Sequence, residues 1–325
     1  MGKNYYNILE VNPKACQEVI HMAYRTLALK HASNPKILQD LNEAKEILLN
    51  TDKRSAYDKE NSPKKVKKIG NYILEDAIAE GGFGTTYKAR HELLGTHVCI
   101  KHANQISLQD EEIMKEEAKA IWDLRHWAIP AIREIIKLDD NSLAIVMSYV
   151  PGATLGQIVE KHGKLEPEHV CWITERVLNA LRYLHTHGVV HGDVKPQNII
   201  VQPDRHSVVL VDYGLSAVKP NSTTKNKGFT PYFASPEQTK GMPLIPESDL
   251  FSLGMTMIYA LGGDVTSKAV PPSVPDEICK FIKNLIQFNV LSRPNWQKED
   301  LCQSISDVRE KSFGRRFSKM KPLPI

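Results

Sequence analysis

Eight residues at positions 191–198, His-Gly-Asp-Val-Lys-Pro-Gln-Asn, place several side chains capable of chemistry next to one another. A carboxylate such as Asp193 can accept a proton from a hydroxyl, and an ammonium such as Lys195 can neutralise negative charge that develops during a reaction. The amide oxygen of Asn198 and the carboxylate of Asp212 are oxygen ligands of the kind that Mg²⁺ binds. The segment is therefore suited to the transfer of an anionic group to a hydroxyl.

A glycine-rich stretch and a lysine come before this segment. The stretch "EGGFGTTYKA" lies between two alternating apolar segments that predict antiparallel strands, and glycine lets a backbone bend sharply and approach phosphate oxygens. Lys101 ends the next predicted strand, "VCIK", and a predicted acidic helix follows it. A glycine-rich hairpin alone is weak evidence, because a plain tight turn has the same composition.

Five motifs in one order resemble the protein kinase family. Residues 191–198 are similar to its catalytic loop H-R-D-x-K-x-x-N, and "VDYGLS" at 211–216 is similar to its D-F-G magnesium loop. The glycine-rich stretch and "VCIK" match its nucleotide-binding elements, and "TPYFASPEQ" at 230–238 matches the end of its activation segment. The match continues in residues that the family uses structurally, which are Ser235, Pro236, Glu237, Asp249 and Arg293.

The resemblance implies an ATP- and Mg²⁺-dependent kinase that phosphorylates protein substrates. Lys195, two residues after Asp193, is the form typical of serine/threonine kinases, and the glycine-rich stretch is similar to that of bacterial, especially cyanobacterial, members. Glu117 is the expected partner of Lys101, with Glu116 as its competitor. The implied catalytic residues are Asp193, Lys195, Asn198, Lys101 and Glu117; the implied nucleotide contacts are Ala79, Gly81, Gly82, Phe83, Gly84, Lys101, Met147 and Tyr149; the implied metal ligands are Asn198 and Asp212.

Gly192 departs from the family pattern, in which an Arg at this position pairs with a phosphorylated residue of the activation loop. Without that side chain, we expect catalysis that does not depend on activation-loop phosphorylation, although Ser222, Thr223 and Thr224 lie in that segment. Ala79 and Thr86 replace a Gly and a Val of the glycine-rich loop, and Ser148 follows the expected gatekeeper Met147. Because adenine is held by backbone groups there, the side chain of Ser148 is expected to matter little.

The first sixty residues form a separate pattern. Apolar residues recur at helical spacing in 16–31 (Val19, Ala23, Tyr24, Leu27) and in 38–49 (Leu38, Leu41, Ala44, Leu48), with a helix-breaking turn between them. The segments "NYYNILEV", "AYRTLALK", "LNEAKEIL" and "DKRSAYD" resemble a DnaJ-type J domain. The family's His-Pro-Asp turn is replaced by Ala32, Ser33 and Asn34, so we expect a docking module with no stimulation of a DnaK-type chaperone.

The predicted fold class is α+β: a bilobal kinase with a β-rich first lobe and an α-rich second lobe, preceded by a small all-α J-like domain. The expected domains are a J-like domain at 1–60, a basic linker at 61–69, a kinase domain at 70–305 and a basic tail at 306–325. "RRFS" around Ser318 could be an autophosphorylation or pseudosubstrate segment, or the tail could be inert. The alternative functions are a nucleotide-binding pseudokinase scaffold and a chaperone-linked adaptor.

Composition is that of an ordinary globular protein. The 325 residues carry a net charge of +4, a mild excess that does not by itself indicate nucleic acid, and no nucleic acid is expected as a partner. The 5 cysteines are far apart in the sequence, which argues against a disulfide framework and a zinc site. No apolar run approaches the roughly 18 residues of a membrane helix, and there is no signal peptide. We therefore expect a cytoplasmic protein without membrane contacts.

Overall fold

The computed structural model describes residues 3–13, 15–61, 68–81, 84–103, 108–315 and 322–324. The chain divides into two compact units, Met1–Val66 and Lys67–Ile325, which are described separately. Among the described residues, none of the helices combines the length and the apolar character needed to cross a membrane.

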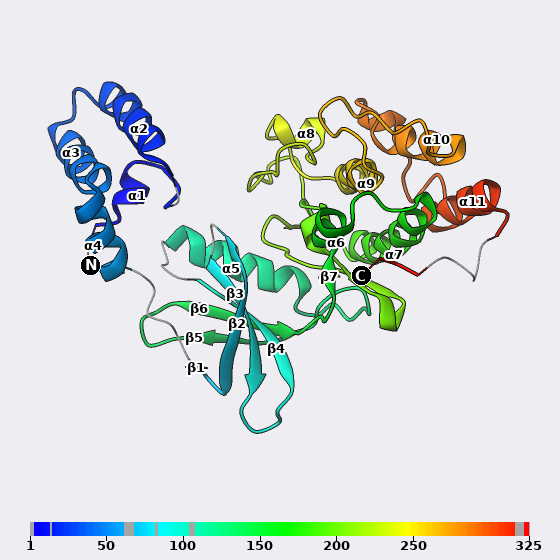
Figure 1. The fold of residues 1–325 in the computed structure, drawn as a ribbon, viewed down its shortest axis with the longest axis horizontal. Coiled ribbons are helices and arrows are strands. Elements are labelled where there is room, and N and C mark those ends of the chain that lie inside the picture. The colour runs from blue at the N-terminus through cyan, green and yellow to red at the C-terminus, as the bar shows by residue number, and fades with distance from the viewer. Residues whose placement is uncertain are drawn as a thin grey trace. The chain divides into compact units, whose positions relative to one another are not determined.

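The first unit is all-helical (Figure 1). Asn34 ends the turn between α2 and α3: its side-chain oxygen accepts a hydrogen bond from the backbone N–H of Ile37 at 3.3 Å, so α3 begins three residues earlier than the apolar pattern predicted. The prediction was wrong for Val19, which is 47% exposed, because Ile20 turns into the core instead. The helices are α1 (Tyr5–Ile8), α2 (Gln17–Lys30), α3 (Pro35–Leu49) and α4 (Thr51–Asn61), and the core comprises Tyr6, Leu9, Ile20, Leu27, Leu41, Ala44 and Leu48.

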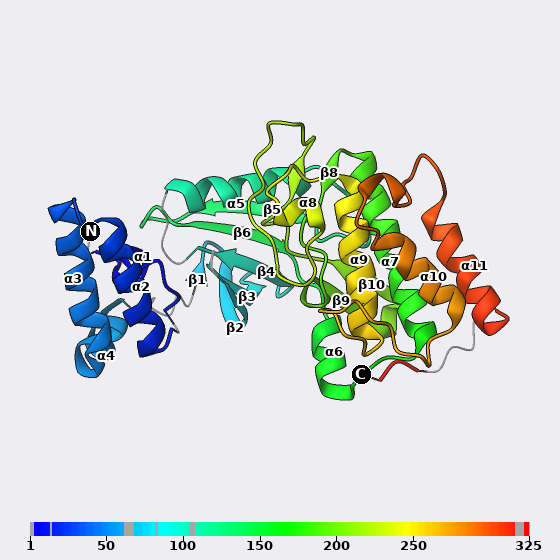
Figure 2. The same cartoon turned by 90° about the horizontal axis from the view of Figure 1, so that it is seen from above.

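The second unit begins with an antiparallel sheet. In the described part of the chain its strands follow the order β1-β2-β3-β4-β6-β5, and α5 (Leu108–Ile121) packs against β5 and β6 (Figure 2). The connector expected at 61–69 is shorter, because Asn61 belongs to α4 and Lys68 pairs with Ile73; 62–67 lie outside the described residues. The strands are β1 (Lys68–Ile69), β2 (Tyr72–Gly81), β3 (Gly84–His91), β4 (His97–His102), β5 (Ile132–Lys137) and β6 (Leu143–Ser148).

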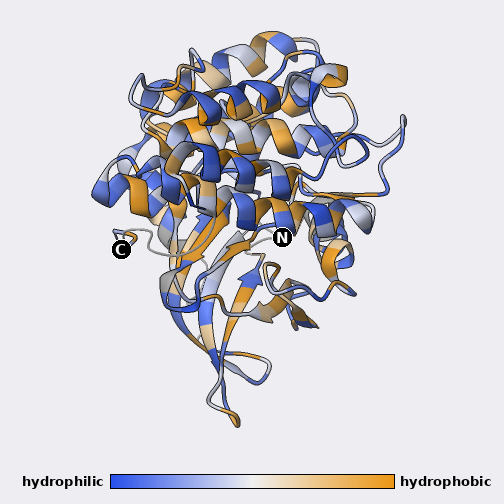
Figure 3. Ribbon diagram, turned by 90° about the vertical axis from the view of Figure 1, so that its right-hand side faces the viewer, coloured by the Kyte–Doolittle hydropathy of each residue, from blue (hydrophilic) through white to orange (hydrophobic). Residues whose placement is uncertain are grey.

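A helical lobe follows the sheet. Apolar and polar residues alternate along its helices, as expected when one side of each helix is buried (Figure 3). Short two- and three-stranded ribbons carry the catalytic and magnesium-loop segments: β7 (Ala153–Thr154), β9 (Ile199–Gln202) and β10 (Ser207–Leu210) form one, and β8 (Val189–Val190) with β11 (Ala217–Val218) forms the other. The helices are α6 (Leu155–His162), α7 (Pro167–Thr186), α8 (Pro236–Thr239), α9 (Pro246–Ala260), α10 (Asp276–Leu285) and α11 (Leu301–Phe313).

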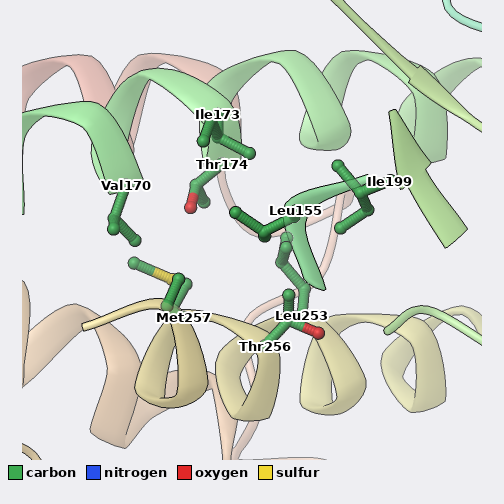
Figure 4. Close-up of a pocket in the computed structure, with 9 residues that line it drawn as sticks. Leu155, Val170, Ile173, Thr174, Ile199, Leu253, Thr256 and Met257 are labelled. Carbon is green, nitrogen blue, oxygen red and sulfur yellow. The ribbon is translucent and has the colours of Figure 1, made fainter. Parts of the chain in front are cut away.

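Helices α7 and α9 form the centre of this lobe. Between them lies an apolar cavity of about 10 Å³, lined by side chains of α6, α7 and α9 and by Ile199 (Figure 4). Its lining is almost entirely apolar, so it is a packing gap below the catalytic segment and not a ligand site.

The predicted α+β fold with a β-rich lobe followed by an α-rich lobe is confirmed. The structure differs at the end of the chain, where the tail was expected to begin at residue 306. Helix α11 continues to Phe313 because Ile305 and Arg309 are buried, and Arg309 donates to Glu168 of α7 at 3.0 Å. Ser318 lies outside the described residues.

Candidate active site

Three charged side chains from three elements meet beside the sheet. The ammonium Nζ of Lys101 on β4 lies 2.9 and 2.7 Å from the two carboxylate oxygens of Glu117 on α5. The same Nζ lies 2.9 Å from Oδ1 of Asp212. Glu116, the competing candidate, is turned to Lys119 on its own helix at 2.8 Å. The structure therefore brings Lys101, Glu117 and Asp212 together and leaves Glu116 out of the bonded cluster.

Burial and pairing act in opposite directions on these groups. Burial works against the charged form of Lys101, but attraction to Glu117 and Asp212 more than compensates and raises the pKa of Lys101. Burial likewise disfavours ionisation of Asp212, and the neighbouring Lys101 ammonium lowers its pKa on balance. Lys101 and Asp212 are therefore both charged near neutral pH, as a group that grips phosphate oxygens or a metal requires.

The glycine-rich hairpin ends in β3, the strand that pairs with β4 and places Thr86 opposite Lys101. Gly81 pairs with Gly84 across the turn between β2 and β3, and Ala79 pairs with Thr86. At Gly84, with φ +141°, an added Cβ would lie 2.2 Å from the carbonyl oxygen of His102, so only glycine fits. Gly82 and Phe83, predicted as nucleotide contacts, lie outside the described residues.

The segment that leaves β6 is fixed by its backbone and by Ser148. Met147 pairs with Cys99 of β4, and the hydroxyl of Ser148 accepts a hydrogen bond from the N–H of Ala131 at 2.9 Å. The ring of Tyr149 lies near the side chains of Lys88 and His97, so contact with a base at this residue would use its backbone. Ser148 thus has a structural bond that its sequence position did not indicate.

Asp193 is the centre of a hydrogen-bonded network in the catalytic segment. Its Oδ2 lies 2.7 Å from Nζ of Lys195 and accepts from Nδ2 of Asn198 at 3.0 Å. The hydroxyl of Thr230 donates to Oδ1 of Asp193 at 2.6 Å and accepts from Lys195 at 2.9 Å. Asp193, Lys195 and Asn198 are thus held together as the sequence spacing suggested. The sequence analysis missed Thr230, although it is the first residue of the "TPYFASPEQ" motif.

The backbone of this segment is held from below by a buried carboxylate. Asp249 on α9 accepts hydrogen bonds at 2.8 Å from the N–H groups of His191 and Gly192. It also contacts Nε2 of His185 at 2.8 Å, while the indole N–H of Trp296 donates to Nδ1 of His185 at 2.8 Å. Because an indole can only donate, Nδ1 is the acceptor and Nε2 carries the proton given to Asp249. Asp249 therefore fixes two consecutive peptides beside Asp193.

Gly192 occupies a position that excludes a side chain. Its φ is +77°, and an added Cβ would lie 2.8 Å from the carbonyl oxygen of Leu215 and 2.7 Å from the side chain of Leu244. The carbonyl of Gly192 accepts from Nε2 of Gln238 at 2.9 Å. The absence of an Arg side chain at position 192 thus coincides with close packing between the catalytic segment and the activation segment.

The two expected metal ligands, Asp212 and Asn198, lie on neighbouring backbone, because the N–H of Val211 donates to the carbonyl of Asn198 at 2.9 Å. Asp212 has a left-handed backbone with φ +66°, and the next residue, Tyr213, is buried and donates its hydroxyl hydrogen to the carbonyl of Leu210 at 3.1 Å. The ring of Tyr213 meets that of His191 at 4.8 Å, edge to face. Among the described residues no group of three His, Cys, Asp or Glu side chains is placed to hold a metal ion. Two protein oxygen ligands suit Mg²⁺ only if phosphate oxygens and water supply the others, which is its usual mode in kinases.

Comparisons with known proteins agree with this geometry. A family model described as the protein kinase domain matches residues 72–305, and one described as the DnaJ domain matches residues 4–58. A probable serine/threonine-protein kinase of Clostridium acetobutylicum is 33% identical over 207 residues, covering 62% of this chain and 31% of the relative. A serine/threonine-protein kinase of Myxococcus xanthus is 33% identical over 205 residues, covering 59% of this chain and 38% of the relative.

A third relative extends further along the chain. A probable serine/threonine-protein kinase of Clostridium perfringens is 31% identical over 260 residues, covering 72% of this chain and 38% of the relative. The chain thus spans about a third of the length of these curated relatives. The resemblance to bacterial kinases is confirmed, and its cyanobacterial part stays a prediction. The chain belongs to the protein kinase family and carries a DnaJ domain ahead of its kinase domain.

Proposed function

We propose that this protein is a serine/threonine protein kinase that transfers the γ-phosphoryl group of ATP to hydroxyls of protein substrates. The observation that carries the proposal is the network around Asp193, whose carboxylate is bonded to Lys195, Asn198 and Thr230. The cluster of Lys101, Glu117 and Asp212 supports it, because Glu117 and Asp212 hold the Lys101 ammonium in place and Lys101 and Asp212 keep the charges that nucleotide binding needs.

In this proposal each side chain has a defined task. Asp193 accepts the proton of the acceptor hydroxyl, which approaches from where the Thr230 hydroxyl now lies against Oδ1. Lys195 neutralises charge on the transferred group, and Lys101 binds phosphate oxygens. Asp212 and Asn198 are the residues that would hold Mg²⁺, which would supply positive charge to neutralise the phosphate oxygens.

The test is transfer of labelled phosphate from ATP with Mg²⁺ to the protein itself and to a generic basic protein. We expect label on serine or threonine. Retained nucleotide binding without any label would contradict the proposal and favour a nucleotide-binding scaffold.

We also propose that catalysis is independent of phosphorylation at Ser222, Thr223 and Thr224. The hydrogen bonds of the two threonine side chains are made to Asn221, at 2.7–3.3 Å, and so stay within one turn. Replacing all three by Ala should change kcat by less than about threefold, because the packing around Gly192 leaves no room for a side chain that could pair with a phosphate. Steady-state phosphoryl transfer measures this, and a hundredfold loss would contradict it.

The DnaJ domain is proposed to be a docking module without chaperone stimulation. In the turn between α2 and α3, Asn34 uses its side-chain oxygen to cap α3, and Ala32 and Ser33 offer no charge. We expect that adding the full chain, with Asp193→Asn to suppress its own ATP use, leaves the ATP hydrolysis rate of a DnaK-type chaperone unchanged. A J protein with an intact His-Pro-Asp turn serves as the positive control, and stimulation by the variant chain would refute this role.

A further inference from the structure

The activation segment, residues 212–238, is ordered around the catalytic segment although Gly192 has no side chain to anchor it. In a kinase that relies on phosphorylation, charge-assisted hydrogen bonds between a cation and a phosphate supply that anchor. Two neighbouring residues, Asn226 and Lys227, make bonds in this structure that can do the same without a phosphate.

Asn226 links the activation segment to the catalytic segment through Gln238. Its Nδ2 donates to the carbonyl of Gln238 at 3.1 Å, and its Oδ1 accepts from the N–H of Gly228 at 3.0 Å. The side chain of Gln238 in turn donates to the carbonyl of Gly192. Hydrogen bonds between neutral groups therefore connect Asn226, through Gln238, to the peptide group that precedes Asp193.

Lys227 links the same segment to the magnesium loop. Its Nζ donates to the carbonyl of Ser216 at 2.9 Å. Ser216 is buried, and its hydroxyl donates to the carbonyl of Tyr213 at 2.6 Å, closing the turn that begins at Asp212. A bond to the Ser216 carbonyl therefore restrains the turn that presents the Asp212 carboxylate.

Lys227 also interacts electrostatically with two carboxylates of α5. Burial lowers the pKa of Lys227, and the carboxylates of Glu116 and Glu117 counteract this by stabilising its charged form. Lys101 keeps both of its bonds to Glu117, so Lys227 adds positive charge near that pair without displacing it. The side chain is half-buried, which distinguishes it from its exposed neighbour Lys225.

We propose that Lys227 is a positioning residue: a lysine of the activation segment that, through its bond to the Ser216 carbonyl, fixes the magnesium loop in the arrangement needed for phosphoryl transfer. It takes the place of a phosphorylated side chain and its cationic partner. The proposal deepens the kinase function proposed above and concerns regulation of the same site. It implies that the enzyme is switched on by folding and not by modification.

The experiment compares Lys227→Met with Lys227→Arg and with the matched control Lys225→Met in the full-length chain. We expect Lys227→Met to lower kcat about 10- to 100-fold, because small displacements of catalytic groups have effects of this size. KM for ATP should change much less, Lys227→Arg should restore most of the loss, and Lys225→Met should behave as wild type. If Lys227 served only stability, Lys227→Met would lower the melting temperature, kcat would not fall selectively relative to KM, and Lys227→Arg would not restore the activity.

A second readout does not depend on catalysis. Amide hydrogen exchange in peptides covering residues 213–230 should be faster in Lys227→Met than in Lys225→Met, because the bond to Ser216 is lost only in the former. If the wild type shows no transfer, this comparison still decides the role of Lys227 while the kinase function fails separately. Unchanged kcat and exchange in Lys227→Met would overturn the proposal. So would increased activity, which would mean that Lys227 competes with Lys101 for Glu117.

Discussion

Replacing Asp193 by Asn is expected to lower kcat for phosphoryl transfer by about 10³-fold, within the range that general base catalysis contributes. Asn has nearly the same shape but cannot accept the proton of the acceptor hydroxyl. The Lys101 cluster that would hold the nucleotide lies on other elements, so the dissociation constant for Mg²⁺-ATP should stay within about twofold. Label transfer measures the first quantity, and equilibrium binding of a non-hydrolysable ATP analogue measures the second.

Asp204→Asn is the matched control for this substitution. Asp204 is an exposed carboxylate in the short helical turn Pro203–Arg205, outside the network of Asp193. Its loss removes the same charge from the same lobe and should leave kcat unchanged. If Asp193→Asn retained more than a tenth of the wild-type kcat, Asp193 would not be the base, and the proton of the acceptor hydroxyl would have to leave to water.

The sequence predicted the parts of the site that lie within short motifs. Asp193, Lys195 and Asn198 are separated by only a few residues, so one loop conformation brings them together. The pairing of Lys101 with Glu117 was implied by the resemblance to the kinase family, whose strand lysine and helix glutamate form such a pair. Glu117 was preferred over Glu116 because it matches the position of the family's glutamate, before an Ala and a Leu-x-His ending, and the structure places only Glu117 in contact with Lys101.

Contacts between distant segments could not be predicted in the same way. Thr230 reaches Asp193 from the end of the activation segment, and Gln238 reaches Gly192 from α8. Neither residue type signals such a bond, because Thr and Gln are common on surfaces and in turns. The partner is decided by how α8 and α9 pack below the catalytic segment, which local periodicity does not determine.

The buried faces and boundaries of the helices also divide into those that the sequence predicted and those that it did not. The stripe of Leu41, Ala44 and Leu48 on α3 was predicted because each lies on the buried face. The assignment of Val19 to the neighbouring core failed because α2 buries Ile20 and Leu27, and a one-residue error in phase rotates a helix by about 100°. The boundary expected between kinase domain and tail, at residues 305 and 306, falls inside α11, whose last turns are held by the bond between Arg309 and Glu168, which are far apart in sequence.

The largest effect on stability is expected at the buried pair of Glu237 and Arg293. Arg293 is 1% exposed, and its two terminal nitrogens lie 2.6 and 2.9 Å from the oxygens of Glu237. It also donates to the carbonyls of Gln287 and Glu247, at 2.8 and 3.0 Å. Arg293→Met should therefore lower the free energy of unfolding by about 3–5 kcal/mol, because it leaves a buried carboxylate without its partner. The control substitution Arg205→Met, at an exposed position, should change the free energy of unfolding by less than about 0.5 kcal/mol.

Acid titration tests the same pair independently. Burial of Glu237 opposes its ionisation, but hydrogen bonds from Arg293 and Ser248 outweigh burial and hold its pKa at about 2, below the usual 4.5. Because its pKa is lowered in the folded state, Glu237 contributes about 3 kcal/mol to the free energy of unfolding. This contribution is complete above pH 4.5 and is lost as the pH falls toward 2. Urea unfolding followed by tryptophan fluorescence reports on this unit, because the 4 tryptophans all lie in Lys67–Ile325. In Arg293→Met the loss between these pH values should be smaller than in the wild type; an equal loss would mean that other carboxylates, and not Glu237, govern the acid sensitivity of the kinase domain.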